Sequence, residues 1–482
     1  MADSAHPRFH PAVVIGVLAS CGIAVSLVQT LVIPLLPRFP QLLSTTPATV
    51  SWLVTATLVA GAVSAPVLGR LGDMYGKRRI LLIALGLITA GSALGAAAPN
   101  VLVLLVGRAL QGASFGVIAL GLSIMRDELP AGRVGSGVGL MSSSLGIGGA
   151  IGLPLAGVVA QTMSWRWLFA ALAVLGVAQY LLVRWIVPES PHRPGGRFDL
   201  PGTIGLGLGL VCLLLAISKG PEWGWTSPTI VGLLVATAVV LPLWGRHELG
   251  RESPLVDLRV SARPAVLWTN LATVLVGFAI FASFIMTTQI LQAAPATGYG
   301  FGLSLVMAGV MLLPMGAAMT IFSPASARLS SRRGPRTTLV VGGSVLAAGN
   351  IGFALRPPTL PWVVVATTVI AVGAALAYSA LPLLIMRAVP SSETAAANSL
   401  NTLMRQLGTS VCSAGVAAVA TALTVAVDGI DQPAPVAYTV IFLAAALAAA
   451  LATMIAALTP GPTTAGTAPE AAVAQAGLGP RR

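Results

Sequence analysis

The feature that most constrains this chain is a succession of long apolar blocks separated by short polar loops. Each block is near or above the roughly 20 residues that a helix needs to cross the hydrocarbon of a bilayer. Only 9% of the 482 residues are charged, whereas soluble domains carry roughly a quarter. We therefore expect an all-α integral membrane protein embedded in a lipid bilayer. Fourteen helices are expected, at about 12–37, 48–69, 79–98, 101–125, 134–161, 165–187, 199–218, 228–245, 264–292, 302–325, 336–355, 361–386, 394–425 and 436–458.

The net charge of +13 has two readings. It could indicate nucleic-acid binding, but nearly all of the 27 Lys and Arg residues lie in the short loops, and no basic stripe has interleaved aromatics. Positive loops mark the cytoplasmic side of a membrane protein. We expect a multi-pass protein of the cell membrane with both termini cytoplasmic and no nucleic-acid partner.

Two polar loops, at 188–197 and 246–263, frame two of the expected spans and leave six before them and six after. The tail is rich in Ala, Gly, Thr and Pro, a composition typical of disorder. The predicted organisation is an N-terminal six-helix bundle at 1–190, two linking transmembrane helices with their flanking loops at 191–258, a C-terminal six-helix bundle at 259–460, and a disordered cytoplasmic tail at 461–482.

A short internal repeat supports two related halves. Residues 69–78 read GRLGDMYGKR and residues 327–336 read ARLSSRRGPR. At a fixed offset of 258, Gly76 matches Gly334 and Arg78 matches Arg336. Both segments join the second and third spans of a six-span unit, and many secondary transporters are built from such duplications, with the substrate site between the halves.

The loop that contains the first repeat is the strongest local motif. Gly69 and Gly76 permit a tight reversal or close packing of helix ends, and Asp73 can accept charge-assisted hydrogen bonds from Arg or from helix N-terminal amides. Lys77 and Arg78 hold the loop on the cytoplasmic side. The alternative is an ordinary positive hairpin whose charges set only topology.

Two arginines lie inside expected spans, where an unpaired charge is costly and marks a functional or a carbonyl-bonded side chain. Arg108 shares a helix face with Gln111, three residues on. Arg405 is the only charge in the membrane core of the second unit. For each arginine, a structural role and a functional role both remain open.

The fifth expected helix is rich in glycine, which favours close helix packing. Its segment Gly148, Gly152, Pro154 and Gly157 could serve this packing alone. Among polar residues within the spans, the candidates for lining a substrate cavity are Gln29, Asn270, Gln289 and Arg405.

Several chemistries find no support in the sequence. No Asp or Glu lies well inside an expected span, no Gly-Lys-Ser/Thr phosphate loop is present, and the cysteines and histidines form no zinc-like cluster. We therefore expect no enzyme activity, no catalytic residue, no metal and no cofactor.

These motifs together resemble the major facilitator superfamily. Gly69, Leu71, Gly72, Asp73, Gly76, Lys77 and Arg78 are similar to its signature gate loop, with Met74 in place of the usual basic residue. The segment Arg108-x-x-Gln111-Gly112 resembles the motif of its fourth helix. The segment from Gly148 to Gly157 resembles its antiporter motif, with Leu153 where a Pro is usual.

The likeness covers nearly the whole chain and extends to the fourteen-span drug:proton antiporters. It implies a major facilitator fold of two six-helix bundles around a central cavity, plus two additional helices. It also implies that Asp73 and Arg78 act in a gate latch, that Arg108 is linked to proton coupling, and that a monomer exports an antibiotic, drug or metabolite by alternating access, driven by the proton gradient. The branch usually carries an acid in the first helix, where this chain has Val28. An importer of the same fold, a membrane sensor or enzyme, and a channel are the alternatives.

Overall fold

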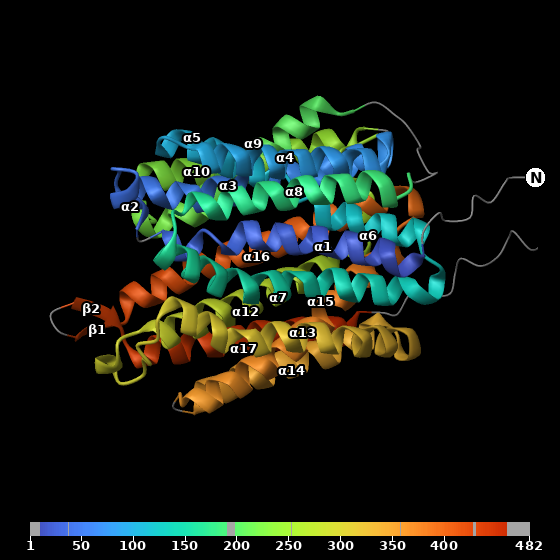
Figure 1. Cartoon of the computed structure of the whole chain (residues 1–482). Coiled ribbons are helices and arrows are strands. Elements are labelled where there is room, and N and C mark those ends of the chain that lie inside the picture. Colours follow the sequence, from blue (N-terminus) through green and yellow to red (C-terminus); the bar gives the residue numbers. More distant parts are fainter. Residues whose placement is uncertain are drawn as a thin grey trace, which may run out of the picture.

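The structure is a computed structural model that describes residues 10–36, 38–189, 198–251, 253–356, 358–427 and 430–459. The predicted disordered tail at 461–482 lies outside these residues. The molecule is built from long helices that run roughly side by side (Figure 1). Thirteen helical segments of the described residues are long and apolar enough to cross a membrane, which agrees with the expected all-α membrane architecture.

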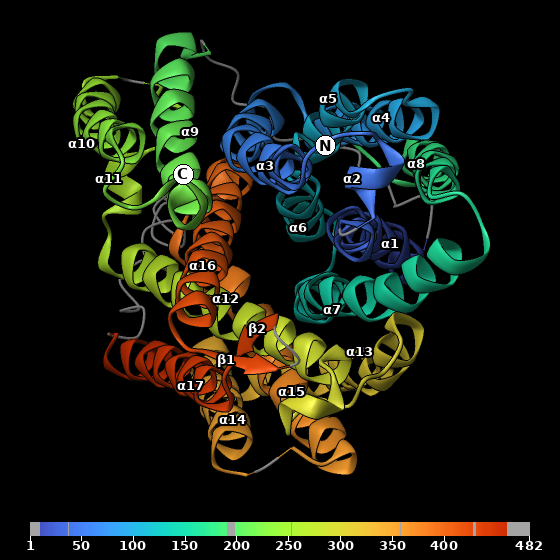
Figure 2. The same ribbon diagram turned by 90° about the vertical axis from the view of Figure 1, so that its left-hand side faces the viewer.

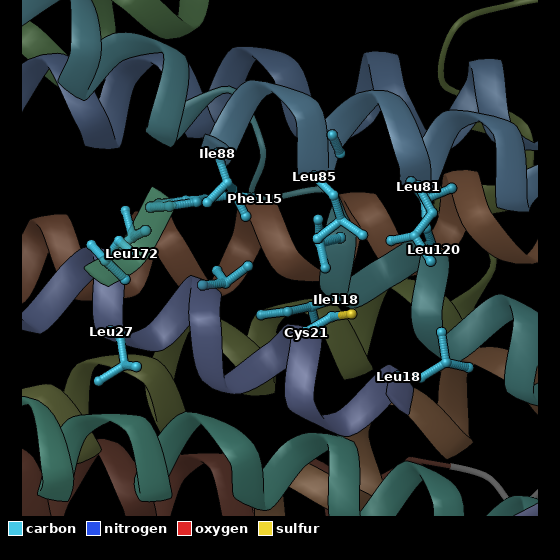
Figure 3. Packing of buried hydrophobic residues seen from close by; sticks show 14 of the residues in the cluster. Leu18, Cys21, Leu27, Leu81, Leu85, Ile88, Phe115, Ile118, Leu120 and Leu172 are labelled. Carbon is cyan, nitrogen blue, oxygen red and sulfur yellow. The ribbon is translucent and has the colours of Figure 1, made fainter. Parts of the chain in front are cut away.

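The first half begins near the N-terminus and ends before the polar loop at 188–197. Its elements are α1 (Pro11–Thr30), the 3-10 turn η1 (Ile33–Leu35), α2 (Phe39–Leu42), α3 (Pro47–Tyr75), α4 (Lys77–Ala97), α5 (Val101–Gly112), α6 (Val117–Glu128), α7 (Ala131–Thr162) and α8 (Arg166–Ile186). Apolar side chains from α1, α4, α6 and α8 meet in its core, as Figure 3 shows for Leu18, Leu85, Ile118 and Leu172.

The second half follows a helical link. The link comprises α9 (Leu200–Trp223), α10 (Pro228–Leu249) and α11 (Leu258–Ser261). The second half comprises α12 (Pro264–Gln292), η2 (Pro295–Thr297), α13 (Leu305–Arg333), α14 (Pro335–Leu355), α15 (Leu360–Ala388), η3 (Ser391–Glu393), α16 (Thr394–Ala422), the strands β1 (Thr424–Val427) and β2 (Ile430–Pro433), and α17 (Pro435–Leu458).

The two groups of helices face each other along a seam in which α7 packs against α13 and α3 packs against α16 (Figure 2). The two linking helices are central in the chain but peripheral in space. Helix α9 packs against α3 and α16 through a small apolar cluster that includes Ala62, Leu206 and Leu403, and α10 packs mainly on α9.

The helix boundaries differ from the sequence expectation in places that have local causes. The first span ends at Thr30 rather than at 37, because Pro34 lacks an N–H and disfavours helix in the residue before it. The expected helix at 101–125 is interrupted between α5 and α6. There Gly112 lies so close to α3 that an added Cβ would be 2.1 Å from the carbonyl oxygen of Thr57.

The thirteenth expected span, at 394–425, is α16, a helix of 29 residues. It is long enough to span but is not among the thirteen apolar segments, because buried polar residues such as Asn398, Asn401 and Gln406 follow one another along it. A polar helix is stable in a membrane when protein rather than lipid surrounds it, and α16 packs against α3, α6, α9, α12 and α15.

Two local features escape the sequence prediction. The segment after α16 forms an antiparallel hairpin, in which Thr424 pairs with Pro433 and Val427 pairs with Ile430. It is fixed by a 2.7 Å hydrogen bond from the Tyr299 hydroxyl to the carbonyl oxygen of Pro433. Lys219, expected in a loop, lies in α9, buried, with its ammonium 2.7 Å from a carboxylate oxygen of Glu222.

Candidate transport site

The signature loop contributes a contact that joins the two halves. Helix α3 continues to Tyr75, so that Gly69 and Asp73 are helical rather than in a loop. The buried carboxylate of Asp73 accepts hydrogen bonds from the backbone N–H groups of Ala395 (3.3 Å) and Ala396 (2.9 Å). These groups belong to the first turn of α16, where unpaired amides and the helix dipole favour a negative charge. Asp73 therefore caps a helix of the opposite half.

Gly69 explains how the two helices come close enough for this contact. A Cβ on Gly69 would lie 2.2 Å from the hydroxyl oxygen of Ser399 and 2.8 Å from the carbonyl oxygen of Ala395. A larger residue at this position would push α3 away from α16. It would thereby separate the Asp73 carboxylate from the two backbone N–H groups that donate to it.

A second cross-seam contact lies beside the first. The Arg126 guanidinium, at the end of α6, donates to the Thr394 hydroxyl (2.6 Å) and to the carbonyl oxygen of Val389 (3.1 Å). Lys77 stays within the first half, with its ammonium 2.7 Å from Asp127 and 3.7 Å from Asp73. We call the contacts of Asp73 and Arg126 with residues 389–396 the latch.

The internal repeat is reproduced in three dimensions. Gly76 (φ 109°) joins α3 to α4, and Gly334 (φ 85°) joins α13 to α14 in the same way. Both glycines occupy the positive-φ region that side chains disfavour. The duplicated sequence therefore corresponds to a duplicated helix–turn–helix, with one copy in each half.

The repeat extends to the arginines. The Arg78 guanidinium donates to the carbonyl oxygen of Arg184, at the end of α8. The Arg336 guanidinium donates to the carbonyl oxygen of Ala456 (2.9 Å), at the end of α17. Each arginine thus ties the third span of its half to the exposed carbonyls at the end of the sixth. Within the part of the chain that the structure describes, the contacts of Arg78 lie in its own half, with Glu189 and Arg184.

Arg108 is buried and bonded within the first half. Its guanidinium donates to the carbonyl oxygens of Val28 (2.8 Å) and Leu53 (3.3 Å) and to the amide oxygen of Gln111 (2.8 Å). Gln111 in turn donates to the Ser92 hydroxyl at 2.8 Å. Arg108 and Gln111 thus fasten α5 to α1, α3 and α4, and neither lines a cavity described below.

The glycine-rich segment of α7 packs against helices of both halves. Gly148 and Gly152 face α1, where added Cβ atoms would lie 2.5 Å from Ser26 and 2.2 Å from Thr30. Pro154 and Gly157 face α13, and a Cβ on Gly309 would lie 2.6 Å from Pro154. The segment therefore sets the close packing of α7 along the seam.

A cavity of about 130 Å³ lies between the halves, and we call it the central cavity. Its walls come from α1, α3 and α7 on one side and from α12, α13, α15 and α16 on the other. The lining residues are Ser26, Gln29, Thr30, Leu58, Leu145, Gly146, Gly149, Ala150, Ile280, Phe281, Phe284, Met315, Met319, Tyr378, Arg405, Gln406 and Thr409. Two predicted cavity residues, Gln29 and Arg405, meet here from opposite halves.

A larger cavity of about 550 Å³ lies between the same halves at the end away from the latch, and we call it the vestibule. It shares Phe281 and Phe284 with the central cavity. It is lined by Ile33, Leu36, Arg38, Val54, Leu153, Gly157, Gln161, Phe281, Phe284, Ile285, Thr288, Gln289, Gln292, Leu305 and Ser413. The predicted residue Gln289 is found here rather than in the central cavity.

Asn270, the fourth cavity candidate, lines neither space. Its amide oxygen accepts a hydrogen bond from Asn401 at 3.0 Å, and Asn401 also donates to Thr273 at 2.7 Å. These bonds tie α12 to α16. Sequence reasoning missed Ser26, Gln406 and Thr409, although Ser26 and Thr409 stand one helical turn from Gln29 and Arg405, a spacing that places them on the same face.

The structure thus defines a polytopic membrane protein whose two related helical halves enclose a cavity. The sequence model of the Major Facilitator Superfamily matches residues 18–413, and the chain belongs to this family. It is a transporter of small molecules rather than an enzyme.

Curated relatives and a solved structure are consistent with this assignment. The chain is 27% identical to the Multidrug resistance protein B homolog of Mycobacterium tuberculosis over 77% of this chain and 68% of that protein. It is 30% identical to the Tetracenomycin C resistance and export protein of Streptomyces glaucescens over 71% of this chain and 62% of that protein. The proton:xylose symporter XylE has a similar fold, with a TM-score of 0.67 at 14% identity over 94% of this chain and 97% of that chain.

Proposed function

We propose that the protein exports a small molecule across the cell membrane by alternating access, in exchange for protons. The observation that carries the proposal is an asymmetry along the seam. The halves are joined at one end, where Asp73 caps α16, and the vestibule separates them at the other end. An alternating-access carrier closes one end of a shared site while the other end is open.

The positive loops assign the two ends to the two sides of the membrane. The latched end carries the arginine-rich turns around Gly76 and Gly334, so we propose that it faces the cytoplasm, with both termini on that side. On this assignment the structure corresponds to the state that is open to the outside. We further propose that the monomer is the transporting unit and that no cofactor is needed besides the proton gradient.

The direction of transport is supported by the names of two relatives, one a multidrug resistance protein and one a tetracenomycin export protein. An antibiotic, a drug or a secreted metabolite is the corresponding cargo. The alternative is that a protein of the same fold imports its substrate. No residue that lines the two described cavities specifically favours import.

The coupling site follows from where the carboxylates lie. No Asp or Glu is among the residues that line the central cavity or the vestibule. Asp73 is an acid whose hydrogen bonds cross the seam. Because protonation would remove the charge that these amides stabilise, we assign the gating proton to Asp73.

Transport in inside-out vesicles tests this proposal. Vesicles that contain the protein should accumulate a cargo from a panel of antibiotics and dyes when their interior is acidified, and empty vesicles should not. Dissipating the pH gradient should abolish the accumulation. Accumulation only in right-side-out vesicles would instead establish the importer.

A further inference from the structure

The two arginines within the spans, the buried Arg108 and the partly exposed Arg405, differ in how their charge is satisfied. Arg108 donates to two backbone carbonyls and to Gln111. Arg405 forms none of the ion pairs or hydrogen bonds that the structure shows among the described residues. Its guanidinium carbon lies 5.5 Å from the centroid of the Tyr378 ring. A cation–π contact provides part of the stabilisation that a desolvated guanidinium needs.

Among the described residues that line the central cavity and the vestibule, none is acidic. Arg405 is the charged residue in the lining of the central cavity, and the charged residue that lines the vestibule, Arg38, is also basic. A guanidinium in a region of low dielectric attracts an anion far more strongly than it would in water. The same charge repels a cationic cargo.

A second polar group in the central cavity also lacks a partner. Gln406 is 6% exposed, and its amide oxygen is buried without a hydrogen-bond donor. A buried acceptor of this kind is costly unless it is satisfied. A ligand hydroxyl would satisfy it, while a ligand anion would satisfy the neighbouring Arg405.

The shape of the space limits the group that enters. The central cavity has a volume of about 130 Å³, close to the ~150 Å³ of an engineered cavity in another protein that binds benzene. Its apolar wall includes Phe281, Phe284, Met315 and Met319, which suit an aromatic ring. Because the vestibule shares two of these residues, a cargo can place one ring in the central cavity and the remainder in the vestibule.

We propose that the substrate is an aromatic weak acid that carries a carboxylate or phenolate together with a hydroxyl group. Its anionic group pairs with Arg405, its ring lies against Phe281 and Phe284, and its hydroxyl donates to Gln406. This inference rests on the proposed function as a transporter, but it concerns binding and is tested separately from transport.

A matched series of probes tests the charge preference. The full-length protein in lipid nanodiscs is titrated with 6-hydroxy-2-naphthoate, with the neutral 6-hydroxy-2-naphthamide, and with the cationic 6-hydroxy-2-naphthylmethylammonium, and binding is measured by calorimetry. We expect the carboxylate to bind at least tenfold more tightly than the amide, and the cation to bind least. Equal affinity for carboxylate and amide, or preference for the cation, overturns the proposal.

Substitutions then identify the residue that causes the preference for the carboxylate probe. Arg405→Gln should bind the carboxylate and the amide equally, and Arg405→Lys should keep part of the preference. Arg356→Gln is the control, because Arg356 also lies over a ring, that of Trp362 at 5.0 Å, but lines neither cavity. A tenfold preference that persists in Arg405→Gln shows that the anion binds elsewhere and overturns the assignment. If Arg405→Gln does not fold, Gln406→Leu decides, since it should weaken all three hydroxylated probes while keeping their order.

Vesicle assays keep this inference apart from the export proposal. Proton-driven uptake of neutral or cationic compounds by a protein that shows no carboxylate preference would uphold export and refute the aromatic-acid inference. A clear carboxylate preference without any proton-driven uptake would uphold the inference about the site and refute export by proton antiport.

Discussion

The latch gives the sharpest quantitative prediction for this protein. In Asp73→Asn, the side chain keeps its size and one acceptor oxygen but loses its charge. The amides of Ala395 and Ala396 bond to different carboxylate oxygens, so one charge-assisted hydrogen bond becomes a neutral one and the other is lost, because the side-chain NH2 of asparagine cannot accept. The end of the molecule that is closed in the structure should open.

The magnitude follows from the number of bonds. A hydrogen bond to a charged group contributes about 1.5–3 kcal/mol and a neutral one about 1 kcal/mol, so weakening one bond and losing the other costs about 2–5 kcal/mol. The interaction of the carboxylate with the N-terminus of α16 contributes roughly 0.3–1 kcal/mol more. When the halves separate, both side chains are hydrated, so the loss falls on the closed state. A loss of about 3 kcal/mol shifts the equilibrium roughly 100-fold.

Distances between two spin labels, measured by double electron–electron resonance, report this shift. The labels are placed on cysteines that replace Tyr75 and Arg387, which are exposed and lie in opposite halves at the latched end. The native cysteines are replaced by alanine. The parent protein should give mainly a short distance, and Asp73→Asn should add a substantial population at longer distance.

Asp257 provides a matched control. Its carboxylate also accepts two backbone N–H groups, from Arg259 (2.8 Å) and Val260 (3.1 Å), but it caps α11 in the link between α10 and α12. Asp257→Asn should leave the distance distribution unchanged. An unaltered distribution in Asp73→Asn, or the same change in both variants, would refute the latch reasoning.

Three further predictions concern packing and burial. Gly408→Ala would bring a methyl group 2.2 Å from the carbonyl oxygen of Val274. We expect about 1–3 kcal/mol of destabilisation and a lower thermal unfolding midpoint. Gly415→Ala on the same helix meets no atom within 4 Å and should leave the midpoint unchanged. Arg108→Ala leaves buried acceptors without their donor, so we expect about 1–3 kcal/mol of destabilisation for each acceptor that stays unsatisfied and loss of transport with membrane insertion retained. Full transport at an unchanged midpoint would contradict it. Gly334→Ala strains a backbone with φ of 85° by about 1–2 kcal/mol, which the same unfolding assay would detect as a small decrease.

The sequence predicted the spans well because lipid imposes a length and an apolar composition that can be read locally. It missed features set by contacts between distant residues. The break between α5 and α6 depends on how closely Gly112 approaches Thr57 of another helix. The hairpin after α16 depends on Tyr299, which lies far away in the chain. Neither contact leaves a periodic pattern in its own segment.

The candidate site divides in the same way. The loop motif indicated that Asp73 could accept hydrogen bonds from Arg or from helix N-terminal amides. Only the fold identifies the donors, because Ala395 and Ala396 are two alanines on a distant helix. Their polarity made Gln29, Arg405 and Asn270 candidates for the cavity. Gln29 and Arg405 line it, whereas Asn270 bonds to Asn401 on another helix. An asparagine that faces another helix has the same composition signal as one that faces a cavity.

The absence of an acid at Val28 changes how the first half handles its buried charge. Position 28 has no carboxylate, and Arg108 donates to the backbone carbonyl of Val28 at 2.8 Å. That carbonyl lies near the end of α1, where carbonyls lack helical partners. The charge of Arg108 is therefore satisfied without a carboxylate, and Arg405 is left as the charge that a cargo in the central cavity meets. From this arrangement we propose that the transporter selects cargo by repelling cations and that it gates through Asp73, a carboxylate that is not among the residues lining its cavities.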